Sequence, residues 1–198
     1  MLYPNPQIYR HLETIFVHVP KTAGTSIEQH LRQSKSQVVG GHTTAIAYRS
    51  AFPIEFNAYF TFAIVRHPYD RFRSAYSYLK QHPINAALAN ESVHTSESIN
   101  DFIATYSNTA TIRDSIVHMF PQHIFVCDRD EAIILEAIYR YETLHSDWGK
   151  ICRRIRIHEC SLPVLNASHR RSTEDFVSAE SKAILAKLYA KDFKLFGY

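Results

Sequence analysis

The sequence predicts an α/β domain with a mainly parallel central sheet, and two observations lead to that class. Short runs rich in β-branched and aromatic residues alternate along the chain with segments of helical spacing. The run at residues 59–65, YFTFAIV, is apolar at nearly every position, which is typical of a strand covered on both faces. The length of 198 residues corresponds to roughly one domain. We therefore expect residues 1–198 to form a single domain.

The first half of the chain contains strand-like runs that end at turn-forming residues. One run, ETIFVHV, stops at Pro20, and another stops at Gly40-Gly41. Helical spacing follows the first run, and it returns after Pro68, a residue suited to a first helical turn. The expected strands are residues 13–19, 36–39 and 59–65, and the expected helices are residues 26–33 and 70–80.

The second half of the chain is predicted to be richer in helices. Residues 178–191 have an apolar face and a capping Ser178, and the run HIFVCD has the character of a buried strand. The segment 138–144 is compatible with either a strand end or a helix start. Polar residues without periodicity over 81–97 predict a mobile surface loop near a binding site. The expected helices here are 98–106, 110–119 and 178–191, and the expected strand is 123–128.

Composition and charge exclude several classes of protein. A net charge of +3 and a pI near 8.7 are too mild for a dedicated nucleic-acid binder, but they fit an anionic small ligand in one basic pocket. No run approaches the roughly 18 apolar residues that cross a bilayer, and no leader-like segment opens the chain. Cys127, Cys152 and Cys160 lack metal-site spacing and are expected to be reduced thiols. We therefore expect a cytoplasmic protein.

The segment Val19–Ser26 combines a strand end, a tight turn and a helix start. Such a turn directs backbone N–H groups and the positive end of the helix dipole at one point. The segment adds the charge of a lysine, three hydroxyl groups and a glycine that permits close approach of an anion. An ordinary βα turn with a solvated lysine is the alternative. The spacing differs from the GxxxxGK[ST] loop of nucleoside-triphosphate enzymes. The candidate ligand residues are Lys21, Thr22, Ala23, Gly24, Thr25 and Ser26.

Two further strand ends carry chemically useful side chains. Arg66 ends the strand 59–65 and could grip a second phosphate, with the Ser74 hydroxyl two helical turns further on. Alternatively, Arg66 pairs with Asp70, and the helix holds Arg71 and Arg73 in water. His42 follows Gly40-Gly41, just past the strand 36–39. Because ligands bind where the strands of an open parallel sheet end, Lys21, His42 and Arg66 together predict an active site.

The sequence resembles the family of sulfotransferases that includes the heparan 2-O and chondroitin carbohydrate sulfotransferases. The resemblance covers almost the whole chain, and its two phosphate motifs are specific when they occur together in this order. The matching segments are FVHVPKTAGTS (16–26), AIVRHPYDRFRSAYSY (63–78), PQHIFV (121–126), YRYETLHSDW (139–148), LPVLNAS (162–168) and YAKDFKLFGY (189–198).

The resemblance implies a three-layer domain like that of the P-loop NTPases and the co-substrate 3′-phosphoadenosine 5′-phosphosulfate (PAPS). Lys21 through Ser26 would hold its 5′-phosphosulfate, and Arg66 with Ser74 its 3′-phosphate. Lys21 would stabilise the leaving phosphate while His42 removes the proton of the acceptor hydroxyl. The expected acceptor is a saccharide, the expected product is 3′-phosphoadenosine 5′-phosphate (PAP), and no metal, nucleic acid or membrane span is expected.

Two other functions remain open at this point. A nucleotide kinase would use Asp128, at the end of HIFVCD, to hold Mg²⁺. A nonenzymatic module with the same fold could bind an acidic polysaccharide or a nucleic acid. The basic residues Lys150, Arg153, Arg154 and Arg156 could guide an acidic saccharide, although a solvated basic face explains that cluster better. Arg170 and Arg171 could reach the nucleotide or the acceptor. The acceptor's identity and the oligomeric state are not encoded in any motif.

Overall fold

The computed structural model describes residues 7–32, 41–158 and 176–198, and the chain divides into two compact units. The first unit comprises the described residues of 1–66 and 122–167, and the second those of 67–121 and 168–198. The predicted strand 36–39 lies outside the described residues. The prediction of a single domain stays a prediction.

The first unit is built around a sheet of four strands in the order β1-β2-β3-β4. β2 and β3 run parallel with Val17 opposite Ala63, β3 and β4 run parallel with Val65 opposite Arg140, and β1 is antiparallel to β2. The carboxyl ends of the three parallel strands therefore meet at one edge of the sheet. The strands are β1 (Ile8–Tyr9), β2 (Thr14–Val17), β3 (Phe60–Val65) and β4 (Ala137–Arg140).

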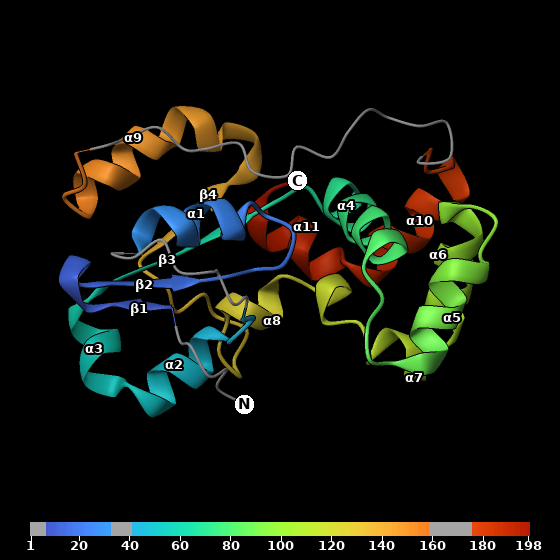
Figure 1. Cartoon of the computed structure of the whole chain (residues 1–198), viewed down its shortest axis with the longest axis horizontal. Coiled ribbons are helices and arrows are strands. Elements are labelled where there is room, and N and C mark those ends of the chain that lie inside the picture. The colour runs from blue at the N-terminus through green and yellow to red at the C-terminus, as the bar shows by residue number, and fades with distance from the viewer. Residues whose placement is uncertain (1–6, 33–40, 159–175) are drawn as a thin grey trace. The chain divides into compact units, whose positions relative to one another are not determined.

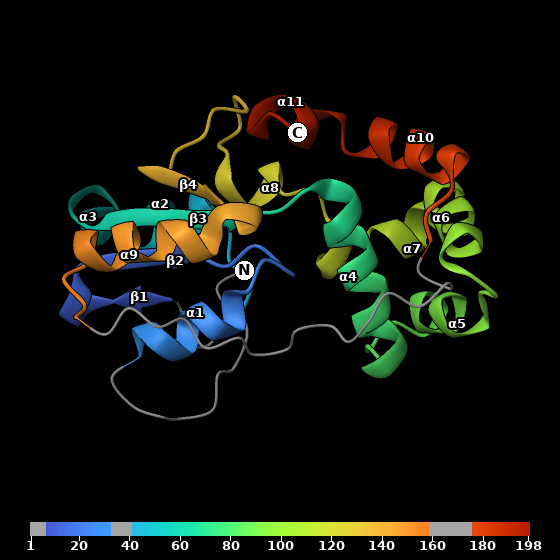
Figure 2. The same ribbon diagram turned by 90° about the horizontal axis from the view of Figure 1, so that it is seen from above.

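Helices flank this sheet on both faces (Figures 1 and 2). α1 (Gly24–Leu31) and α9 (Leu144–Arg154) cover one face, where Phe16 and Phe62 of the strands pack with Ile27 and Trp148 of the helices. α2 (Ala45–Ala51) and α3 (Pro53–Ala58) lie on the other face. Every residue of β3 is buried, as the continuous apolar run 59–65 predicts. The predicted α/β class with a mainly parallel sheet is confirmed for this unit.

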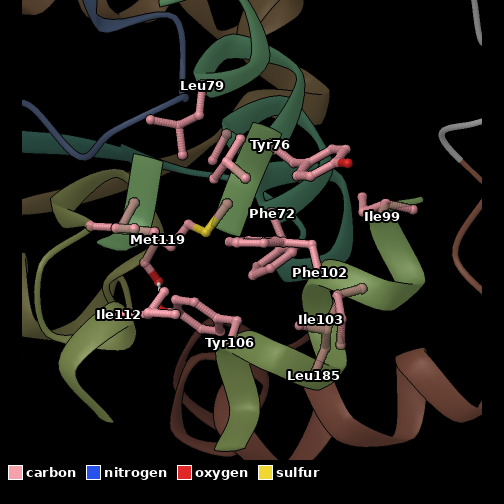
Figure 3. Packing of buried hydrophobic residues seen from close by; sticks show 14 of the residues in the cluster. Phe72, Tyr76, Leu79, Ile99, Phe102, Ile103, Tyr106, Ile112, Met119 and Leu185 are labelled. Carbon is pink, nitrogen blue, oxygen red and sulfur yellow. Dashed lines mark hydrogen bonds between the residues drawn. The ribbon is translucent and has the colours of Figure 1, made fainter. Parts of the chain in front are cut away.

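The second unit is a helical assembly around its own apolar core (Figure 3). Phe72, Phe102 and Tyr106 pack together at its centre, with the rings of Phe72 and Tyr106 at 5.4 Å and edge to face. Its helices are α4 (Pro68–Gln81), α5 (Ala87–Thr95), α6 (Ile99–Asn108), α7 (Ala110–Arg113), α10 (Ala179–Leu188) and α11 (Ala190–Phe196).

Capping residues set the helix starts that the sequence predicts correctly. The Ser178 hydroxyl accepts from the N–H of Ser181 at 3.1 Å, so the terminal helix begins where predicted, although it breaks at Tyr189 into α10 and α11. Ser98 accepts from the N–H of Asp101 in the same way at the start of α6. Pro68 occupies the first turn of α4, as predicted.

The predicted strand 123–128 is wrong. His123–Val126 forms a helical turn, α8, in which Phe125 and Val126 are buried, and pairing is limited to one bridge between Cys127 and Ile133. A short apolar run does not distinguish a strand from a buried helical turn, because periodicity has no room to develop.

The predicted mobile loop over 81–97 is also wrong. α5 occupies most of this segment, and it buries Ala89 and Val93, which stand four residues apart in the core of the second unit. Short alanine-rich helices bury little apolar area, so the spacing of two small side chains is easily overlooked.

Three smaller boundaries differ from the predictions. The strand 13–19 ends at Val17, and the helix 110–119 divides into α7 and a 3₁₀ turn, η2 (Val117–Met119). The ambiguous segment 138–144 contains both alternatives, since β4 ends at Arg140 and the 3₁₀ turn η3 (Tyr141–Thr143) follows it. A further 3₁₀ turn, η1 (Arg10–Leu12), joins β1 to β2.

Arg71 corrects the interpretation that placed it on a solvated helix face. Its side chain is fully buried in the second unit. The guanidinium donates to the carbonyl oxygens of His118 at 2.9 Å and Phe120 at 2.6 Å. It therefore fastens the segment after α7 to α4.

Within the described residues, no helix combines the length and apolar character that crossing a membrane would require.

Candidate active site

The turn between β2 and α1, residues 18–23, is tightly wound. Lys21 (φ 65°) and Ala23 (φ 67°) both adopt left-handed backbone conformations that are uncommon outside glycine. The Thr22 hydroxyl donates to the Val19 carbonyl at 2.8 Å and closes the turn from within. Strained non-glycine residues cluster at functional sites, where the surrounding structure maintains them. This β2–α1 turn leads the chain directly into the first N–H groups of α1.

Gly24, the first residue of α1, is required by space. A Cβ at this position would lie 1.9 Å from Nε2 of His18, so only glycine leaves room for the imidazole ring. The sequence predicts that glycine admits an anion, but its closest neighbour here is a histidine. The packing of His18 therefore dictates this glycine of the motif.

The hydroxyl groups of the motif differ in their surroundings. Thr25 is exposed, whereas Ser26 and Thr22 are buried. The Thr22 hydroxyl already donates its proton within the turn, so Thr22 would contact an anion through its backbone N–H. Lys21 and Ala23 are half-buried beside them.

Lys21 and Arg66 meet at the carboxyl edge of the sheet, as their positions after β2 and at the end of β3 predict. Nη1 of Arg66 donates to the carbonyl oxygen of Lys21 at 3.4 Å. Burial first, and then the positive charge of Arg66, lower the pKa of the Lys21 ammonium from 10.5 to about 8. Both causes disfavour the charged form of Lys21, and an anion between the two side chains would offset the repulsion between Lys21 and Arg66.

Gln122 and Tyr141 position Arg66, and sequence reasoning did not single them out. The buried Gln122 amide makes a two-point contact with the Arg66 main chain, accepting from its N–H at 2.9 Å and donating to its carbonyl at 2.8 Å. The guanidinium of Arg66 lies 4.2 Å from the centre of the Tyr141 ring. Both residues fall within matched segments, PQHIFV and YRYETL, and that is the signal that could have identified them.

His42 lies against the β2–α1 turn. Its Nδ1 is 3.0 Å from the carbonyl oxygen of His18, and because a carbonyl only accepts, Nδ1 carries the proton. The neutral ring then has its lone pair on Nε2, which is the tautomer a general base needs. The rings of His42 and His18 meet edge to face at 4.7 Å. The candidate base is thus attached to the same turn as Lys21.

A sequence model of the sulfotransferase family matches residues 8–198, a span that includes residues of both units. The chain belongs to the sulfotransferase family. The resemblance is thereby confirmed at the level of the sulfotransferase family, and the protein is a transferase of sulfuryl groups. Comparisons with curated proteins and with solved structures find no match to this sulfotransferase.

Ser74 lies on α4 in the second unit of the sulfotransferase, where it is half-buried. Its pairing with Arg66 stays a prediction. Arg170 and Arg171 lie outside the described residues.

Asp128, the residue that would serve a kinase, closes a local turn instead. Its carboxylate accepts from the N–H groups of Asp130 and Ala132, both at 3.1 Å, and lies 3.8 Å from Arg49. Across the described ranges 7–32, 41–158 and 176–198, no three His, Cys, Asp or Glu side chains are grouped closely enough to hold a metal ion.

The basic residues of 150–156 include two members paired with acids on the surface of the first unit. Lys150 contacts Asp147 at 2.6 Å, and Arg154 contacts Glu136 at 2.9 Å. These exposed pairs favour the interpretation as a solvated face over a polymer-binding surface.

Proposed function

We propose that this sulfotransferase moves a sulfuryl group from PAPS to the hydroxyl of a saccharide and releases PAP. One observation carries the proposal: Lys21 and Arg66 meet at the start of α1, and His42 is held on the same turn by the His18 carbonyl. Two cations, a helix N-terminus and a base with its lone pair on Nε2 are the groups that transfer from a phosphosulfate requires. We also propose that the fold is a three-layer domain like that of the P-loop NTPases.

The chemistry of these donors suits a phosphosulfate. The first N–H groups of α1 have no acceptor within the helix, and they carry the positive end of its dipole. The ammonium of Lys21 and the exposed hydroxyl of Thr25 add donors next to them. We assign Lys21 through Ser26 to the 5′-phosphosulfate and Arg66 with Ser74 to the 3′-phosphate. PAPS would supply an activated sulfuryl group on a phosphate leaving group.

The residues of the chain then have distinct tasks. His42 Nε2 accepts the proton of the acceptor hydroxyl, whose oxygen bonds to sulfur as the bond from sulfur to the phosphate oxygen breaks. That phosphate retains the electron pair of the broken bond. Lys21 and the N–H groups of α1 stabilise the charge that gathers there, by analogy with phosphoryl transfer.

The decisive experiment measures transfer of ³⁵S from labelled PAPS to a panel of saccharides. We expect the wild type to label at least one saccharide, and His42→Ala to lose roughly 10²- to 10⁴-fold in kcat while PAP affinity stays within about threefold. His82→Ala, at the exposed C-cap of α4, is the matched control and should retain full activity. Normal turnover of His42→Ala would contradict the role of this base, and failure of the wild type to bind PAP would contradict the proposed function.

A further inference from the structure

Next to the proposed base, a buried hydrogen bond between a histidine and a glutamate joins the strand end to the helix. Nδ1 of His18 lies 2.5 Å from Oε1 of Glu28, and the two side chains are 7% and 0% exposed. His18 directly follows β2, whereas Glu28 lies within α1. A carboxylate removed from water is costly unless donors surround it, so such a pair calls for an explanation beyond the filling of space.

Glu28 is the centre of a wider network. Its Oε2 accepts from Arg32 at 3.3 Å, and its Oε1 also accepts from the buried Gln7 amide at 3.4 Å. The same Gln7 nitrogen donates to the carbonyl of Gly41 at 3.1 Å. The network therefore extends from α1 to the residue that immediately precedes His42.

His42 depends on residue 18 in two ways. The His18 main-chain carbonyl receives the Nδ1 proton of His42, and the His18 ring packs against the His42 ring at 4.7 Å. The His18 ring is itself confined, because it lies where a side chain of Gly24 would be and stacks on Phe16 at 5.8 Å. His18 thus supports the base through both its carbonyl and its ring, and Glu28 holds that ring by a hydrogen bond.

We propose that His18 and Glu28 are positioning residues of the transfer reaction, which hold His42 in its Nδ1–H tautomer and attach it to the β2–α1 turn. The inference rests on the proposed function. It assigns His18 a role beyond packing. A base has to stay within about 0.5 Å of its productive position, and a displacement of about 1 Å can cost on the order of 10²-fold in rate.

The main test compares two substitutions of Glu28. Glu28→Leu removes the acceptor of the His18 Nδ1–H and should lower kcat roughly 10- to 100-fold, with KM for PAPS within about threefold. Glu28→Gln keeps an oxygen acceptor of the same shape and should restore kcat to within about threefold of the wild type. Gln29→Ala, at an exposed position on the same helix, is the matched control and should leave kcat and KM unchanged.

A spectroscopic readout separates positioning from mere stability and does not need turnover. Nitrogen-15 spectra of the histidines should show His42 as the Nδ1–H tautomer in the wild type and in Glu28→Gln. Glu28→Leu should shift His42 toward a mixture of tautomers. A folded Glu28→Leu with wild-type kcat and an unchanged His42 tautomer would overturn the proposal.

The two proposals can fail separately. A wild type that transfers no sulfuryl group would contradict the proposed function. The tautomer of His42 would still show whether Glu28 positions the His42 ring. Where Glu28→Leu does not fold, Gln7→Met tests the same network, because it removes the amide that contacts Glu28, Gly41 and Tyr48 and leaves the His18–Glu28 hydrogen bond in place. We expect Gln7→Met to lower kcat roughly 3- to 10-fold and to broaden the His42 signals; wild-type values of both would count against the network.

Discussion

Arg66 donates to the main-chain carbonyl of Lys21 at 3.4 Å, although the two residues are 45 positions apart in the chain. The contact joins the ends of two neighbouring parallel strands, so the guanidinium braces the β2–α1 turn while adding a second positive charge beside it. This arrangement makes the two cations interdependent.

Removal of either cation should weaken nucleotide binding. PAP at 100 times its Kd should stabilise the wild type by about 2.7 kcal/mol, which raises Tm by roughly 5–10 °C. Lys21→Ala and Arg66→Ala each lose charge-assisted hydrogen bonds, so the shift at the same PAP concentration should fall below about 2 °C. Differential scanning fluorimetry measures this. Lys182→Ala, on the exposed side of α10, should respond like the wild type; a full shift in both site variants would rule out the assignment.

The lowered pKa of Lys21, about 8, makes PAP binding dependent on pH. Below pH 8 the ammonium is already charged, and affinity should be nearly constant. Above pH 8 the free protein loses this proton and must take it up again on binding, so the affinity should fall by up to about tenfold per pH unit. Calorimetry at pH 8.5 in buffers of different ionisation enthalpy should detect the proton uptake.

Lys21→Arg provides the control for that titration, because a guanidinium stays charged throughout the range. Its affinity should vary little between pH 7 and pH 9.5, measured in the same buffers. A wild-type Kd for PAP that is flat across pH 7–9.5 would refute the role of this ammonium.

The stability of the ligand-free wild type should change with pH in the opposite direction to its PAP affinity. The unfolded chain holds the lysine proton more tightly than the folded protein does, so the free energy of unfolding should increase as pH rises from 8 toward 10.5.

Gln122 should affect PAP binding only through its contacts with Arg66. Gln122→Met removes both hydrogen bonds to the Arg66 main chain and should raise the Kd for PAP roughly tenfold. The Kd for adenosine 5′-phosphate, which lacks the 3′-phosphate assigned to Arg66, should change less than about threefold. Titration calorimetry with the two nucleotides gives both constants. Gln81→Met, at an exposed position, is the control, and equal losses for both nucleotides would show that Gln122 acts on the site as a whole.

Arg71 and Arg73 offer a test of burial in the second unit. Arg71→Leu removes the fully buried guanidinium and leaves the carbonyls of His118 and Phe120 without their donor, so it should lower the free energy of unfolding by about 2–4 kcal/mol. Arg73 forms a partly exposed pair with Asp70 at 3.0 Å, so Arg73→Leu should cost less than about 1 kcal/mol. Urea unfolding of the two variants measures the difference, and equal costs would contradict the buried role of Arg71.

The sequence by itself determined the features that depend on neighbouring residues. The apolar run of β3, the Ser178 cap, the proline that starts α4 and the tight turn before α1 are all encoded within a few positions. Because the carboxyl ends of parallel strands share an edge, the placement of Lys21 beside Arg66 also followed from the order of the elements.

Only the tertiary structure decided the contacts between residues distant in the chain. The contact of the Gln122 amide with Arg66 joins residues 56 positions apart, and the contact of the His18 carbonyl with His42 joins residues 24 positions apart. Folding also buries the charge of Arg71, which the local sequence pattern places in water. α8 and α5 escaped prediction for a related reason, since a few apolar residues take their conformation from the surface against which they pack. Local propensity cannot report such contacts, because their free energy comes from groups that meet only when the chain has folded.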